Sequence, residues 1–184
     1  MKFARDLSNM TKRPATDPME LAFARTEKTD GILVVEGKKL HVNKALLSCH
    51  SDYFNTLFKA DFKEKSMPEI EIEDVKFEDF ATLLSLVQKD PIEPTVDNAG
   101  RLLELSERFM LTAAKRHVEH FLILSEMSNF EKLELADGFG LNSLLTHTLK
   151  KYDNIFDIIN QAERYSKFSD NSKARLFDRV IGLK

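Results

Sequence analysis

The sequence has few of the features that mark disulfide-bonded, secreted or membrane-spanning proteins. Its single cysteine, Cys49, cannot form an internal disulfide, which is typical of proteins in a reducing compartment. The N-terminal residues 1–18 lack the continuous apolar run of a signal peptide, and no apolar stretch approaches the ~20 residues that span a bilayer. These features predict a cytoplasmic or nuclear protein, or one found in both compartments, with no membrane partner.

The chain also lacks an excess of basic charge and the common catalytic signatures. Its net charge is −3 and its pI about 6.0, which argues against a nucleic-acid surface. No glycine-rich phosphate loop, zinc-protease helix or nucleophile elbow occurs. The pair His117-x-x-His120 has too few ligands for zinc, and Cys49 and His50 point in different directions along a helix. We therefore predict a protein that is not an enzyme and needs no cofactor or metal.

The composition of the chain predicts a folded protein whose N-terminal segment lies outside the folded part. Hydrophobic residues make up 42% and charged residues 31% of 184 residues, enough for one domain or one domain plus a helical module. Residues 1–16 are polar and are predicted to be disordered. The Asp17-Pro18 pair then predicts the start of a short helix that runs through Arg25.

Residues 30–74 carry the mixed helix and strand pattern of the chain. Two apolar runs flank Glu36-Gly37 and predict a β-hairpin. The strict alternation at 69–72 predicts a third strand, with Glu69 and Glu71 facing solvent. The remaining elements predicted here are strands at 32–35 and 39–42, helices at 44–48 and 51–58, and a charged loop at 61–68.

The rest of the chain is predicted to be helical and contains an internal echo. A helix is expected over 76–88, and helices continue from about residue 96 to the end. The pattern that begins at Leu103 recurs thirty residues later at Leu133, and His117 corresponds to His147. Either the two units are repeats that stack as helical hairpins, or both show only the residue pattern that any amphipathic helical hairpin has. The sequence favours neither.

Taken together, the segments G-K-K-L-H-V-N-K-A-L-L-S, S-D-Y-F-N-T-L-F and E-I-E-I-E-D-V resemble the BTB/POZ domain, in particular that of MATH–BTB adaptor proteins. The resemblance implies an α+β fold, a small sheet flanked by helical hairpins. It places the BTB/POZ domain and its dimerisation helix at 17–125. It implies that 126–184 form a helical extension of the 3-box or BACK-like kind.

The resemblance also implies a site for cullin-3. Members of the family that recruit cullin-3 often carry an apolar-x-Glu motif before the third strand, and Phe62-Lys63-Glu64 occupies that place. Phe62 would then enter a pocket of cullin-3, Glu64 would pair with a cullin helix, and Phe58 would lie one turn before them. An apolar side chain beside a fixed charge is in itself a plausible docking feature.

Two further groups of residues follow from the resemblance. A dimer interface is implied at Met19, Ala22, Phe23 and Leu46. A partly buried charge pair is implied between Asp30 and Lys44.

Two functions remain open at this point. The first is an adaptor that dimerises, as a homodimer or with other BTB proteins, and recruits cullin-3 to a RING-type ubiquitin ligase acting on an unknown client. The second is a scaffold or decoy that only dimerises. The first function is the leading hypothesis, because Phe62-Lys63-Glu64 stands in the place of the family's motif. The second is the alternative, supported by the lack of a recognised substrate-receptor segment.

Overall fold

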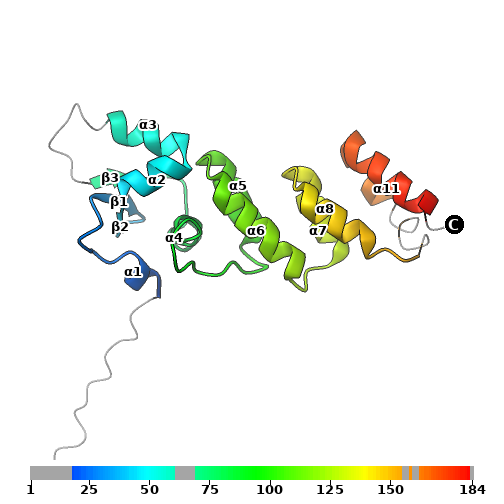
Figure 1. Ribbon diagram of the computed structural model, residues 1–184, viewed down its shortest axis with the longest axis horizontal. Helices are drawn as coiled ribbons and strands as arrows, with labels where there is room; N and C mark the ends of the chain where they lie inside the picture. The colour runs from blue at the N-terminus through cyan, green and yellow to red at the C-terminus, as the bar shows by residue number, and fades with distance from the viewer. Residues whose placement is uncertain (1–17, 61–68, 155–157, 159–161, 183–184) are drawn as a thin grey trace, which may run out of the picture.

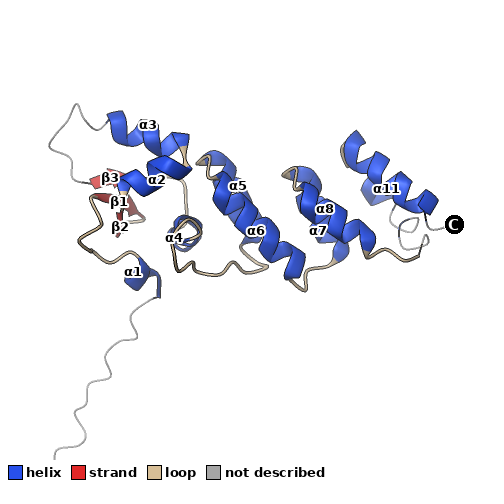
Figure 2. Cartoon of the chain, in the orientation of Figure 1, coloured by secondary structure: helices blue, strands red, loops and turns tan. Residues whose placement is uncertain are grey.

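The computed structural model describes residues 18–60, 69–154, 158 and 162–182. Figure 1 shows an elongated molecule, with a small sheet at one end and helices stacked in a row toward the other. The predicted α+β architecture is confirmed: one three-stranded sheet is accompanied by helices on the N-terminal side and followed by helices alone (Figure 2).

The bounds of the elements agree with most of the predicted ranges to within a few residues. The N-terminal part holds α1 (Pro18–Ala22), β1 (Gly31–Val35), β2 (Lys38–Val42), α2 (Lys44–His50), α3 (Asp52–Ala60), β3 (Glu69–Glu71) and α4 (Phe77–Ser85). The helical part holds α5 (Ala99–Arg108), α6 (Thr112–Leu124), α7 (Asn129–Gly138), α8 (Asn142–Lys150), α10 (Ala162–Tyr165) and α11 (Asp170–Gly182).

The sheet has the strand order β2-β1-β3, with β1 antiparallel to β2 and parallel to β3. Leu33 of β1 lies opposite Leu40 on one side and Ile70 on the other. Because side chains alternate along a strand, this register puts Leu33 and Leu40 in the core, where both are fully buried.

The predicted hairpin turn is confirmed, and it has a second role. Glu36 and Gly37 both have a positive φ, 49° and 76°, as a tight two-residue turn between antiparallel strands requires. The Glu36 carboxylate then accepts a hydrogen bond from the Phe77 amide (3.0 Å), at the start of α4. This bond is the main reason that the pKa of Glu36 is lowered, and Lys76 adds to it. The turn therefore caps a helix 41 residues away.

The first helix is shorter than expected, and the helix expected over 76–88 also ends early, at Ser85. The sequence predicts that the first helix continues to Arg25, but α1 ends at Ala22. The reason is that the Phe23 carbonyl accepts a hydrogen bond from the amide of His41 in β2 (3.1 Å). The chain therefore leaves the helix to pair with the edge of the sheet.

The internal echo corresponds to two equivalent helical hairpins, α5–α6 and α7–α8. Met110 and Gly140, thirty residues apart, both adopt a positive φ, 52° and 63°. Directly after them, the amides of Leu111 and Leu141 each donate to the carbonyl five residues earlier, at 2.8 Å in both. This is the hydrogen-bond pattern of a helix that ends in a left-handed residue. The two hairpins also pack on each other through α6 and α8 (Figure 1), so of the two interpretations left open, stacked hairpins are confirmed.

A buried lysine joins the two hairpins. Lys132 of α7 is 1% exposed, and its ammonium donates to the carbonyls of Ser125 (2.6 Å) and Ile123 (3.4 Å) at the end of α6. Burial lowers the pKa of Lys132, as expected for an ammonium removed from water. The bonds fall on carbonyls that a helix end leaves without partners, at the negative pole of its dipole. Lys132 therefore fixes where α7 begins relative to α6.

Charged side chains also cap the later helices across hairpins. Glu119 of α6 accepts from the amides of Ser143 (2.8 Å) and Leu144 (3.0 Å) at the start of α8. Arg179 of α11 donates to the carbonyl of Tyr152 (2.8 Å), just past the end of α8. Each contact satisfies backbone groups that the helix itself cannot pair.

Asp137 of α7 holds the start of α11. Its carboxylate accepts from the Ser169 amide (3.0 Å) and hydroxyl, and Ser169 accepts in turn from the Ser172 amide (3.3 Å). Burial acts to raise the pKa of Asp137, but hydrogen bonds from Ser169 and Ser172 outweigh it and lower the pKa below its usual 3.8. Ser169 therefore caps the start of α11.

Removing the buried ammonium should destabilise the chain. We expect Lys132→Ala to lower the free energy of unfolding by about 2–4 kcal/mol, because it leaves a cavity and two buried carbonyls without donors. Lys132→Met, which keeps most of the volume, should lose roughly half as much. Urea unfolding followed by circular dichroism measures this. The exposed Lys150→Ala serves as the control, within about 0.5 kcal/mol of the original chain. An equal loss for the alanine variants of Lys132 and Lys150 would contradict the proposed joint.

The Asp137 contact predicts a pH dependence of stability. The pKa of Asp137 is lower in the folded chain than its usual 3.8, so the carboxylate stabilises the fold fully above pH 3.8. The contribution is lost as the pH falls through the lowered value. We expect Asp137→Asn to cost about 1 kcal/mol near neutral pH, as for loss of a helix cap. The difference should shrink below pH 3.8 in unfolding curves measured against pH. The exposed Asp178→Asn serves as the control at neutral pH, where it should change the free energy of unfolding by at most about 0.5 kcal/mol. A penalty for Asp137→Asn that stays constant with pH would refute the assignment.

Candidate functional site

The structure places the three predicted cullin-3 residues in different settings. Phe62 and Glu64 lie outside the described residues, in the connection between α3 and β3. Phe58, in the last turns of α3, is 6% exposed and its ring stacks on Phe54 at 5.8 Å. Phe58 is therefore a core residue that positions the end of α3, from which this connection departs.

The start of α3 is tied to the turn between α5 and α6. The Ser51 hydroxyl donates to the Phe109 carbonyl (2.6 Å), and Tyr53 meets the Phe109 ring edge-on at 5.0 Å. Phe109 also stacks on Phe54 at 5.8 Å. In Figure 1, α3 and the adjoining end of α5 lie along the same edge of the molecule. The helix that leads into the Phe62–Glu64 connection is thus held beside the first helical hairpin.

Sequence reasoning missed Met110 on this edge. It follows the buried Phe109, adopts a positive φ and is exposed. A non-glycine residue with positive φ is uncommon, and its repeat counterpart is Gly140. The comparison of the two repeats could have identified it, because a methionine stands where the second hairpin has glycine.

The predicted dimer residues divide into surface and interior. Ala22 and Leu46 are exposed, and Met19 is half-buried against the core. Phe23 is 1% exposed, so its side chain belongs to the interior of its own chain and offers no surface to a partner in this structure. Leu21, which the sequence analysis did not name, is 63% exposed.

The short length of the predicted first helix could have identified Leu21 as an exposed apolar residue. Helix α1 buries none of its residues, so an apolar residue on its outer face stays exposed among the described residues. Among the described residues, Leu21 of α1 and Leu46 of α2 are the large apolar side chains exposed at the N-terminal end.

Asp30 and Lys44 do lie together, with the contact through the main chain. The Asp30 carboxylate accepts from the Lys44 amide at 2.7 Å, at the start of α2. Asn43 completes the cap by accepting from the Leu46 amide at 2.7 Å. A side chain at Gly31 would approach the Lys44 Cε to 2.8 Å, so the glycine leaves room for the lysine stem. These residues fix the angle between the hairpin and α2.

An ion pair between a buried carboxylate and a largely exposed guanidinium links the N-terminal part to the first helical hairpin. Asp79 of α4 is buried, and its carboxylate accepts from the Arg101 Nε of α5 at 2.7 Å. The hydrogen bond and the charge of Asp79 raise the pKa of Arg101, which keeps it cationic. The pair orients α5 on α4 and leaves no carboxylate free for catalysis at this position.

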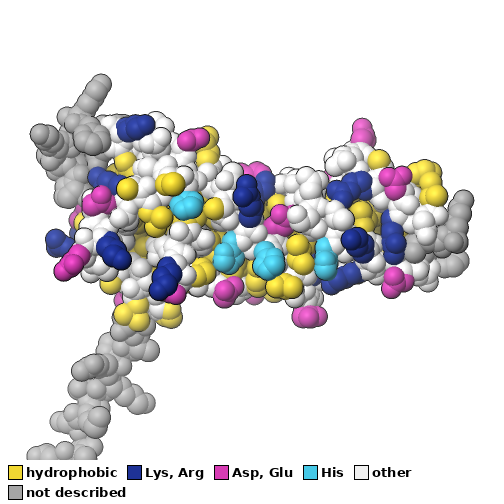
Figure 3. Space-filling model, in the orientation of Figure 1, with side chains coloured by type: hydrophobic (Ala, Val, Ile, Leu, Met, Phe, Trp, Pro, Cys, Tyr) yellow, Lys and Arg dark blue, Asp and Glu magenta, His cyan; other side chains and the backbone are white. Residues whose placement is uncertain are grey.

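Within the described ranges the chain offers no metal centre. No group of three or more His, Cys, Asp or Glu side chains is placed there to hold a metal ion. Figure 3 shows several histidines spread along one face of the helical part, without forming such a group. The same ranges hold no helix with the length and apolar character needed to cross a membrane. What the geometry provides is exposed apolar surface on well-fixed helices.

Comparison with known proteins agrees with this reading. The family model described as BTB/POZ domain matches residues 19–126, more than half of the chain. The BTB/POZ domain-containing protein Y57A10B.3 of Caenorhabditis elegans is 34% identical over 183 residues, 95% of this chain and 58% of the relative. BTB and MATH domain-containing protein 36 of the same organism is 31% identical over 158 residues, covering 84% and 49%. The chain thus spans about half the length of the curated relatives it matches.

Solved structures give weaker likenesses. The BTB domain of human gigaxonin is 23% identical with a TM-score of 0.44, covering 58% of this chain and 93% of that one. The BTB domain of zebrafish PATZ1 is 18% identical with a TM-score of 0.44, covering 53% and 77%. The match of the family model and the identity of the curated relatives together establish that this chain belongs to the BTB/POZ family, whose domains act in protein–protein interaction as adaptors.

Proposed function

We propose that this chain is a BTB adaptor that dimerises and recruits cullin-3 to a RING-type ubiquitin ligase. The observation that carries the proposal is the Phe62-Lys63-Glu64 motif in the connection between α3 and β3 of a BTB chain. Ubiquitin transfer would be carried out by other subunits, and the client is unidentified.

The surroundings of the motif support this proposal. Helix α3 ends at Ala60, two residues before Phe62, and its last turns are anchored in the core by Phe58. The exposed Met110 directly follows Phe109, which contacts Ser51 and Tyr53 at the start of α3. A helix of cullin-3 that received Phe62 could therefore also contact the first helical hairpin.

The motif combines an aromatic side chain, which a partner can bury, with a carboxylate, which can form a charged contact. A buried aromatic anchor in an interface is worth ~2 kcal/mol or more. A carboxylate near the start of a partner helix adds a smaller contribution, because the helix dipole favours negative charge there. We assign the first part to Phe62 and the second to Glu64.

The motif is tested by binding of the purified chain to the N-terminal domain of cullin-3. We expect Phe62→Asp with Glu64→Ala to weaken the affinity roughly thirtyfold, which corresponds to ~2 kcal/mol. Isothermal titration calorimetry measures the change. The matched control is Phe177→Asp, an exposed aromatic on α11, which should bind like the original chain. If the double variant binds as tightly as the control, the proposed contact is wrong.

A second function, a scaffold that only dimerises, is supported by the N-terminal surface. Leu21 is 63% exposed on a five-residue helix, and Leu46 is exposed on α2. A helix this short is marginal by itself, so packing against a second copy would stabilise it. This function shares the dimer with the adaptor but lacks the cullin-3 contact.

Dimerisation is tested by light scattering coupled to gel filtration. We expect the original chain to elute as a dimer and Leu21→Asp to shift it toward the monomer, because a charge cannot be buried unpaired in an apolar interface. Leu124→Asp, an equally exposed leucine at the end of α6, should leave the dimer intact. A monomeric original chain would refute both functions, whereas a dimer that fails to bind cullin-3 would leave the scaffold.

A further inference from the structure

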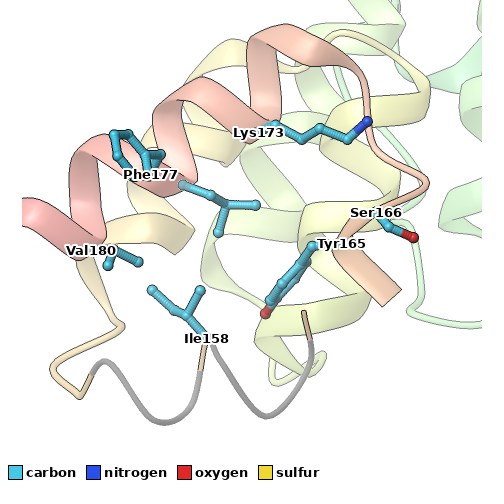
Figure 4. A pocket seen from close by; sticks show the side chains of 7 residues that line it. Ile158, Tyr165, Ser166, Lys173, Phe177 and Val180 are labelled. Carbon is cyan, nitrogen blue, oxygen red and sulfur yellow. The ribbon is translucent and has the colours of Figure 1, made fainter. Parts of the chain in front are cut away.

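An open apolar groove lies at the α11 end of the molecule, far along the chain from the N-terminal surfaces. Figure 4 shows its walls, with α11 on one side and Ile158 and Tyr165 on the other. Leu176 is buried at its base, and Phe177 rises beside it while remaining 63% exposed. Its volume is about 270 Å³. Pockets for drug-sized ligands begin at roughly 300 Å³, so this groove suits one or two side chains.

Helix α11 carries large apolar side chains that the core of the chain does not bury. Phe177 and Ile181 are one helical turn apart and are both exposed, although Leu176 and Val180 on the adjacent face pack against the core. Large apolar side chains that remain in water beside a groove are typical of a docking surface. The groove and this face together form what we call the α11 surface.

One end of the groove is polar. Figure 4 shows Lys173 and Ser166 there, opposite Phe177 and Val180. The Lys173 ammonium is 3.8 Å from Asp170, whose side chain is fully exposed. An exposed pair of this kind contributes little to stability, so a partner's carboxylate could replace Asp170.

The charge around the α11 surface differs from that of the chain as a whole. Residues 162–182 contain five basic and three acidic side chains, whereas the whole chain carries a net charge of −3. Figure 3 shows Lys and Arg side chains gathered over the α8 and α11 end of the face in view. This end of the molecule therefore favours an acidic partner.

We propose that the α11 surface binds a short linear segment of another protein that combines a bulky apolar side chain with a neighbouring acidic residue. The apolar side chain enters the groove above Leu176 and against Phe177. The acidic residue pairs with Lys173 at the polar end. That the bound segment belongs to a ubiquitination client rests on the proposed adaptor function, whereas the binding itself does not.

The probe is a phage-displayed library of random linear peptides, selected on the full chain. We expect the enriched peptides to pair Leu, Phe, Ile or Met with Asp or Glu. Fluorescence anisotropy with these peptides should show that Phe177→Ser weakens binding by at least about tenfold. Leu124→Ser, an exposed leucine on α6, should leave the affinity unchanged.

A charge exchange tests the polar end. Lys173→Glu should weaken the acidic peptides by about three- to tenfold, and peptides with the acidic residue changed to lysine should bind this variant better than the original chain. Failure to enrich such peptides, or enriched peptides that bind Phe177→Ser normally, would overturn the proposal. A change of oligomeric state in Phe177→Ser would also overturn it, because a second copy would then be the occupant.

The same variants separate this proposal from the adaptor function. Phe177→Ser should lose the peptides while keeping its affinity for the N-terminal domain of cullin-3. Peptide binding without cullin-3 binding would support the α11 surface and overturn the adaptor role. Cullin-3 binding without peptide selection would overturn the α11 surface alone.

Discussion

The geometry of the helical row depends on how one buried ammonium is satisfied. Lys132 is removed from water, and among the described residues its ammonium donates to two carbonyls at the end of α6. An unpaired buried charge is expensive, so α7 must begin where those carbonyls can be reached. The matching position of the first hairpin is Leu102, which is also fully buried but fixes no direction. Unlike a leucine at this position, the lysine fixes the position of α7 relative to α6.

This joint connects surfaces that serve different purposes. Exposed Leu21 and the α3 edge belong to the sheet-containing end, and the groove beside Phe177 belongs to the far end. The carboxylates of Glu119 and Asp137 connect later helices in a similar way. Glu119 of α6 accepts from an amide at the start of α8, and Asp137 of α7 accepts from the amide just before α11. An adaptor needs such separation, since two partners can then be held at once without competing for space.

Local patterns in the sequence predicted most of the fold. Glu36-Gly37 identified the hairpin, because few residue pairs favour two consecutive positive φ values, and the thirty-residue spacing identified the two helical units. The site was less predictable. The family resemblance implied a dimer interface at Phe23 but could not show that the Phe23 carbonyl pairs with β2 and that its ring is buried. The burial of Lys132 depends on a carbonyl geometry that exists only after α6 and α7 have packed.

The central claim, that the connection after α3 is where cullin-3 binds, is tested most directly by hydrogen exchange of the full chain with and without the cullin-3 N-terminal domain. We predict that exchange slows at residues 61–68 and around Met110, while amides of α11 exchange at the same rate in both samples. Slowing confined to α11, or no change at 61–68 in a sample shown to contain the complex, would contradict the account.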